Sequence, residues 1–66
     1  MTAQRLLRRR EVEELTGLSR SSIYDEMSEG RFPKPVNIAA RSVAWLESEL
    51  AEWQAQRISE RNGRAA

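Results

Sequence analysis

The 66-residue sequence predicts a mostly α-helical fold of three helices and one small β-hairpin. Apolar residues recur at helical spacing in three separate stretches, and a glycine follows each of the first two. Two short runs of alternating apolar and polar residues lie between the second and the third stretch. A chain of this length fits a single domain, which buries about 60% of the surface that its unfolded form exposes.

The first predicted helix covers residues 9–16, where Val12 and Leu15 are three positions apart and glutamates occupy the opposite side. Gly17 follows at the position where a helix commonly ends on a left-handed residue. Leu18 can then pack back toward Val12, which completes the stop signal.

The two ends of the chain carry weaker signals. Residues 1–8 show no cap and no clear period, so we expect a flexible N-terminal arm from which Leu6 or Leu7 packs back on the core. Residues 62–66 follow the last periodic stretch and are expected to form a flexible C-terminal tail. The folded domain is therefore predicted to span residues 9–61.

The second predicted helix begins after Ser19, a preferred N-cap residue. Leu18 before this cap and Ile23 at the fourth helical position form the pair of a hydrophobic staple. Ile23 and Met27 lie four positions apart on the inner face, and Gly30 supplies the second stop signal. Because so few residues separate the two helices, the spacing indicates a helix-turn-helix corner.

A β-hairpin is predicted after an extended, proline-containing segment at residues 32–35. Residues 36–38 and 42–45 alternate apolar and polar side chains, with Ala39 and Ala40 between them at the expected tip. Alanines are unusual at a tip, because tight hairpin turns favour residues such as Asn and Gly.

The third helix is marked by Leu46, Leu50, Trp53 and, more weakly, Ile58, and we expect it to run to about residue 61. Trp53 shares the period of the two leucines and Trp45 alternates with Val43, which favours a place in the core for both indoles. Alternatively, the two tryptophans serve as stacking platforms for single-stranded nucleic acid.

The helix-turn-helix corner followed by a hairpin predicts a winged helix-turn-helix domain.

The composition argues against several kinds of site. The chain has no cysteine and no histidine, so disulfides, thiol nucleophiles and the usual zinc and iron ligands are absent. Ser21, Ser22 and Tyr24 have no histidine to activate them, and no phosphate-binding glycine loop is present. We therefore expect neither an enzyme nor a cofactor, a metal or a small-molecule substrate. Without a long apolar run or a signal peptide, the sequence predicts a cytoplasmic protein with no membrane partner.

Opposite charges are segregated along the chain, although the formal net charge is only +1. The basic residues before Trp45 are Arg5, Arg8, Arg9, Arg10, Arg20, Arg31, Lys34 and Arg41. After Trp45, glutamates outnumber arginines. A basic half is the electrostatic pattern expected of a protein that contacts phosphates. Alternatively, the arginines only keep a small surface soluble.

The second helix and the basic residues around it form the candidate binding surface. A helix docked in the major groove of DNA directs its N-terminal residues at base edges, and Arg20, Ser21 and Ser22 lie in this first turn. Tyr24 can reach a phosphate or a thymine methyl. The surrounding basic candidates are Arg9, Arg31 and Lys34. Alternatively, these side chains are helix caps and solvated surface.

Four segments carry a resemblance to a known family: EVEELTGLSRSSIYDEM, EGRFPKPV, SVAW and LESELAEW. They closely resemble the AlpA family of small prophage regulators, which are related to phage excisionases and to the DNA-binding domain of MerR-type proteins. The resemblance implies a winged helix-turn-helix that reads duplex DNA. It implies that Arg20, Ser21, Ser22 and Tyr24 belong to the recognition helix and that Arg41 lies near the wing tip.

The sequence departs from the family pattern at two places. Asp25 follows the tyrosine where such sequences commonly carry a basic residue. Its carboxylate either repels phosphates or accepts a hydrogen bond from cytosine N4, so Asp25 is also a candidate contact. The wing tip lacks the glycine often found there, which affects the position of Arg41.

The resemblance implies a sequence-specific, duplex DNA-binding protein of phage or prophage type, located at the nucleoid. It would act as an AlpA-like transcriptional regulator or as an excisionase. One small domain contacts only a short stretch of groove, so we expect cooperative self-association on DNA. The alternative function is a protein interaction adaptor or anti-regulator with the same fold, which the acidic residues of the second and third helices favour.

Overall fold

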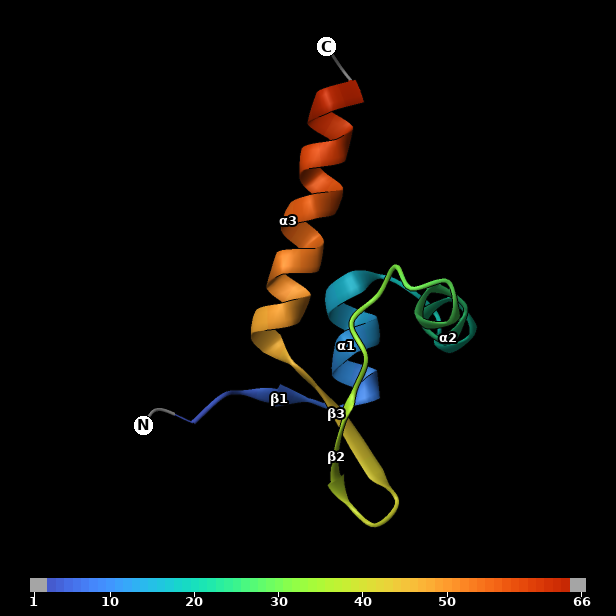
Figure 1. Cartoon of the computed structure of the whole chain (residues 1–66), viewed down its shortest axis with the longest axis vertical. Helices are drawn as coiled ribbons and strands as arrows, with labels where there is room; N and C mark the ends of the chain where they lie inside the picture. The colour runs from blue at the N-terminus through green and yellow to red at the C-terminus, as the bar shows by residue number, and fades with distance from the viewer. Residues whose placement is uncertain (1–2, 65–66) are drawn as a thin grey trace.

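The computed structural model describes residues 3–64 and confirms the predicted fold class (Figure 1). Three helices surround a small antiparallel sheet with strand order β1-β3-β2. The elements are β1 (Leu6–Leu7), α1 (Arg9–Thr16), α2 (Arg20–Ser28), β2 (Val36–Ala39), β3 (Ser42–Leu46) and α3 (Glu47–Arg64). The predicted arm and tail include residues 1–2 and 65–66, which lie outside the described residues.

The corner between α1 and α2 is built by the predicted caps. Gly17 has φ of 76°, and its N–H donates to the carbonyl of Glu13 at 2.8 Å. The Ser19 hydroxyl oxygen accepts from the backbone N–H of Ser22 at 3.2 Å. Leu18, between the two caps, packs against the core. The three-residue turn therefore satisfies the helix ends and fixes the angle between α1 and α2.

The end of α2 is closed by a Schellman motif. The N–H of Gly30 donates to the carbonyl of Met27 at 3.0 Å, and the N–H of Arg31 donates to the carbonyl of Glu26 at 2.9 Å. Gly30 has φ of 75°, the left-handed conformation that this motif requires. Its role as the second stop signal is confirmed.

The hairpin turns one residue later than the sequence predicts. Ala39 pairs with Ser42, so the turn consists of Ala40 and Arg41 instead of the expected alanine pair. Among the described residues only glycines have positive φ, so this turn lacks the left-handed conformations of the favoured hairpin turns. A bulge at Ile38, where the register shifts, accommodates the resulting mismatch in strand twist. Arg41 consequently lies in the tip itself.

Strand β1 was not predicted, because two residues are too short to show a periodic pattern. Leu7 pairs with Trp45 and Leu6 pairs with Leu46, which extends the sheet beyond β3. The expectation that one of these leucines packs on the core is confirmed for Leu7, which is buried. The stretch expected to be an arm therefore contributes a strand and a core residue.

Helix α3 differs from its prediction at both ends. Leu46, expected in the helix, is the last residue of β3, and the helix begins at Glu47. It continues through Gly63 to Arg64 instead of ending near residue 61. An isolated glycine inside a helix costs about 1 kcal/mol relative to alanine, which is too little to end it, and Gly63 itself does not adopt a positive φ.

The core lies between the sheet and the three helices. Its largest fully buried side chains are those of Trp45, Ile23, Leu50 and Val12. The indole N–H of Trp45 donates to the carbonyl of Pro33 at 3.0 Å, and that of Trp53 donates to the carbonyl of Arg31 at 3.0 Å. The Trp53 ring also packs edge-on against Phe32, with 5.1 Å between centroids. The interpretation as a core residue is confirmed for Trp45, whereas Trp53 is half-buried and packs against the edge of the core. Both indoles hold the loop after α2.

Gly30→Ala should lower the free energy of unfolding by about 1 kcal/mol, because alanine adopts positive φ only at a cost. An added Cβ would meet no heavy atom within 4 Å at Gly30 or at Gly63, so steric clashes do not contribute. Gly63→Ala, inside α3, is the matched control and should leave stability unchanged or slightly higher. Thermal melts followed by circular dichroism measure both; equal destabilisation would contradict the assigned role of Gly30.

Candidate nucleic-acid interface

Arginines from two distant parts of the chain meet at one groove. Its lining residues are Arg8, Arg9, Arg10, Tyr24, Arg41 and Val43. The first three lie at the start of α1, the tyrosine comes from α2 and the last two come from the hairpin. We call this surface the arginine groove; it has a volume of about 430 Å³. It joins three of the predicted site residues, namely Arg9, Tyr24 and Arg41.

The start of α1 concentrates positive charge at the arginine groove. Helix α1 begins after Arg8, whose backbone N–H donates to the Glu11 carboxylate at 3.0 Å. This contact caps the helix, so three consecutive arginines are held in its first turn. The side chain of Arg9 donates to Glu13 one turn later, with 3.0 Å between nitrogen and oxygen. Because this pair is partly exposed, it orients Arg9 more than it stabilises the fold.

Helix α2 presents different side chains to the core, to solvent and to the groove. Ile23 and Met27 face the core. At 100° per residue, Ser21 and Asp25 lie on the opposite side, and both are exposed. Tyr24 lies on the flank toward the arginine groove. The outward face of α2 therefore borders a surface rich in arginine.

Arg20 extends the positive surface along α2. Its guanidinium lies over the ring of Tyr24, at 5.9 Å from the centroid. Such a cation–π contact is worth about 0.5–1 kcal/mol at an exposed site. It holds the Arg20 side chain at the first turn of the helix, next to the groove.

Ser22 lies on the other flank of α2, one turn before Glu26. Its hydroxyl oxygen accepts from the Ser19 hydroxyl at 3.0 Å, within the cap of the helix. The exposed hydroxyl of the first turn on the outward face is thus that of Ser21.

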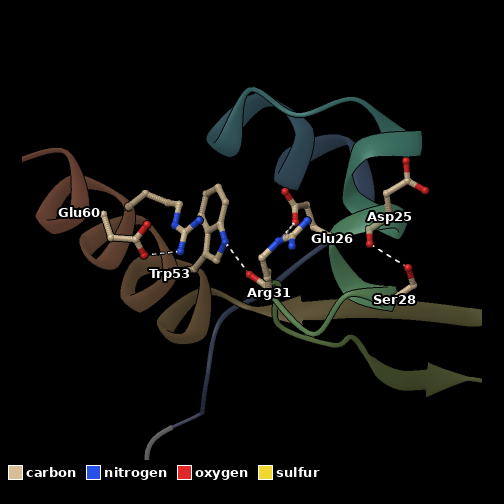
Figure 2. A network of polar contacts seen from close by, with 7 residues as sticks. Asp25, Glu26, Ser28, Arg31, Trp53 and Glu60 are labelled. Carbon is tan, nitrogen blue, oxygen red and sulfur yellow. Dashed lines mark hydrogen bonds and ion pairs between the residues drawn. The ribbon is translucent and has the colours of Figure 1, made fainter. Parts of the chain in front are cut away.

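Arg31 and Lys34 do not line the arginine groove. Arg31 donates to Glu26 with 2.7 Å between the atoms, as Figure 2 shows. This hydrogen bond and the charge of Glu26 raise the pKa of Arg31, with a smaller contribution from Glu29. Arg31 lines a separate groove with Glu49 and Glu52 of α3. Lys34 is exposed in the loop that follows α2.

The backbone carbonyl of Asp25 accepts a hydrogen bond, and the side-chain carboxylate points outward. The carbonyl of Asp25 accepts from the Ser28 hydroxyl at 2.9 Å, whereas its carboxylate points away from the contacts around Arg31 (Figure 2). The carboxylate is therefore presented on the same face of α2 as Ser21.

Two arginines of the groove were not among the candidates from the sequence. Arg8 and Arg10 line the arginine groove together with Arg9. Three consecutive arginines at the start of a helix were the available signal, because residues in one turn share that end of the helix.

Neither a metal-binding cluster nor a membrane-spanning helix is found in the part of the chain that the structure describes. Within residues 3–64 no group of acidic side chains is arranged to hold a metal ion. No described helix is both long and apolar enough to cross a membrane.

Comparison with known proteins shows that the sequence is similar to one family of phage proteins. The family model of the prophage CP4-57 regulatory protein (AlpA) matches residues 5–58, from the residue before β1 into the second half of α3. An uncharacterised protein, ORF88, of Enterobacteria phage P4 is 48% identical over 61 residues, which cover 92% of this chain and 69% of that protein. The DNA-binding transcriptional activator AlpA of Escherichia coli K12 is 37% identical over 62 residues, which cover 85% of this chain and 89% of that protein.

Proposed function

The chain belongs to the AlpA family of prophage regulatory proteins, and from this premise we propose that it binds duplex DNA sequence-specifically. The observation that carries the proposal is the arginine groove, which lies beside the outward face of α2. A groove lined by four arginines and one tyrosine suits a polyanion, and the neighbouring helix face offers groups that can read bases. The function is binding, with no catalytic role.

In this proposal α2 lies in the major groove and the hairpin contacts the backbone beside it. Arg8, Arg9 and Arg10 at the start of α1 and Arg41 at the hairpin tip contact the phosphates on the Tyr24 flank of α2, because all four line the same groove. Phosphate contacts of this kind fix the register of the protein without reading sequence.

Sequence is read by the outward face of α2. Ser21 donates to or accepts from base edges, and Asp25 accepts from cytosine N4. Arg20 contacts a guanine or a phosphate, held by its stacking on Tyr24. Ser22 remains a candidate through water, because its hydroxyl is engaged with Ser19.

Arg31 and Lys34 follow the C-terminal end of α2, whereas Arg20 and Ser21 lie in its first turn. Lys34 is exposed and can contact a phosphate of a longer site. Arg31 is held by Glu26, so its first role is to close the end of α2. Both remain secondary contacts in the proposal.

The regulatory role that we propose is control of transcription, with direction of excision as the second possibility. The relative from Escherichia coli is named a transcriptional activator, which favours the first. A DNA-binding regulator of this kind works in the cytoplasm at the nucleoid. Cooperative binding is expected, since one small domain covers a short stretch of groove.

Selection of bound duplexes from a random pool tests the function directly. We expect recovery of a short motif, or of a repeated one, whose affinity falls log-linearly with salt. Failure to enrich any motif, together with no salt dependence of duplex binding, would instead favour the protein-interaction adaptor.

Arg41→Ala should weaken binding to every duplex by a similar factor and lower the magnitude of the salt slope by about 1, because it removes one phosphate contact. Arg57→Ala, on α3 outside the arginine groove, is the matched control and should leave the slope unchanged. Binding isotherms over a salt series measure both. A change in sequence preference with Arg41→Ala would show that the hairpin tip reads bases.

Asp25→Ala should relax the preference at one base pair by about 1–3 kcal/mol, because it removes the oxygen that accepts from cytosine N4. Glu29→Ala removes the same charge at the exposed end of α2 and should leave that preference intact. The measurement is affinity for duplexes changed one pair at a time. An equal gain in affinity for all duplexes with Asp25→Ala would mean that Asp25 only repels phosphate.

A further inference from the structure

The C-terminal part of α3 has no partner within the described domain. Helix α3 has 18 residues and is therefore about 27 Å long. The side chain of Gln54 donates to the carbonyl of Leu15 at 2.9 Å, which ties the middle of α3 to the end of α1. The C-terminal end of the helix extends past every other element, as Figure 1 shows. Gln56 and Arg57 still line a groove with the loop after α2, so we call residues 58–64 the α3 extension.

The α3 extension carries an exposed apolar residue where the helix leaves the domain. Ile58 is 53% exposed and lies one turn beyond Gln54. At 100° per residue, Ile58 shares one side of α3 with Ala51 and Glu47. Arg61 follows one turn later. This side of α3 therefore runs from acidic through apolar to basic.

A negatively charged groove lies on the same side of the domain, and its charge is opposite to that of Arg61. Leu15 of α1 is 43% exposed at its edge, and the groove is further lined by the glutamates Glu11, Glu14 and Glu47 with Arg5 and Leu7. Glu47 forms an ion pair with Arg5 at 3.3 Å, and the Glu11 carboxylate accepts from the backbone N–H of Arg8. The groove therefore offers an apolar contact beside an excess of negative charge, whereas the α3 extension offers an apolar contact beside arginine.

We propose that the α3 extension of one copy lies on the Leu15 side of a second copy, in a two-fold symmetric pair. In this pair Ile58 packs on Leu15 and Ala51 of the partner, and Arg61 faces Glu14. Because each copy carries both halves of the surface, the symmetry forms every contact twice. We infer that the partner is a second copy of this chain, because a single face carries both the exposed apolar residues and the two charges that complement each other. Two copies can therefore contact each other through the same face.

The proposed surface leaves the arginine groove open. On α1, Arg9 and Leu15 lie on opposite flanks of the buried Val12, so the arginine groove and the self-association face point in different directions. The face is small, which predicts weak association in free solution and a larger effect when two copies bind neighbouring sites. The proposal does not depend on DNA binding, and its test is made without DNA.

Sedimentation of the free protein at rising concentration tests the pair. We expect the wild type to self-associate, and Ile58→Ala to weaken association several-fold. Glu14→Arg and Arg61→Glu should each weaken it roughly tenfold, because two symmetric attractions become repulsions. Mixing these two variants should restore association. In the mixed pair, one contact joins the arginine introduced at position 14 to the glutamate introduced at position 61. The other contact joins the unchanged Arg61 to the unchanged Glu14. Both contacts are then attractive.

The controls separate this surface from general charge effects. Glu52→Arg changes the net charge as Glu14→Arg does, but it lies outside the proposed face and should leave association unchanged. Circular dichroism confirms that each variant is folded. A wild type that stays monomeric at millimolar concentration overturns the proposal, and so does a mixture of the two charge-reversed variants that associates no better than either alone.

Discussion

The buried indole of Trp45 is the interaction on which the rest of the structure depends. Trp45 lies in β3, the central strand, which pairs with β1 on one side and β2 on the other. Its ring is fully buried with Ile23 of α2 and Leu50 of α3, and its N–H holds the carbonyl of Pro33. Burial of one such ring and its hydrogen bond is worth a few kcal/mol, a large share of the stability of a domain this small. The same side chain thus fixes the hairpin, α2 and α3 relative to one another.

Helix α1 then divides the charges of the molecule. Its buried Val12 faces the core, Arg9 lies on the flank toward α2 and the hairpin, and Glu11 and Leu15 lie on the other flank. A formal net charge of +1 conceals this separation, because positive and negative faces cancel in the sum. Two surfaces with different chemistry result, one suited to phosphates and one suited to a second copy of the chain.

The parts of the fold that local chemistry determines were predictable from the sequence. Gly17, Ser19 and Gly30 are helix caps whose roles follow from their own conformational and hydrogen-bonding preferences, and all three are confirmed. Strand β1 and the hairpin tip depend instead on pairing between distant residues. Leu7 is held by Trp45, and the turn at Arg41 is accommodated by a bulge, neither of which a local pattern encodes. The full arginine groove could not be predicted for the same reason: Arg8 and Arg10 are far from Arg41 in the sequence and meet it only in the folded chain.

The central claim is that duplex DNA lies on the arginine groove and on the outward face of α2. Titration of isotopically labelled protein with a selected duplex, followed by backbone amide chemical shifts, tests it most directly. The account predicts that the largest changes fall at the start of α1, along α2 from Arg20 to Asp25, and at Arg41. Changes concentrated around Leu15 and Ile58, with the arginine groove unaffected, would contradict it.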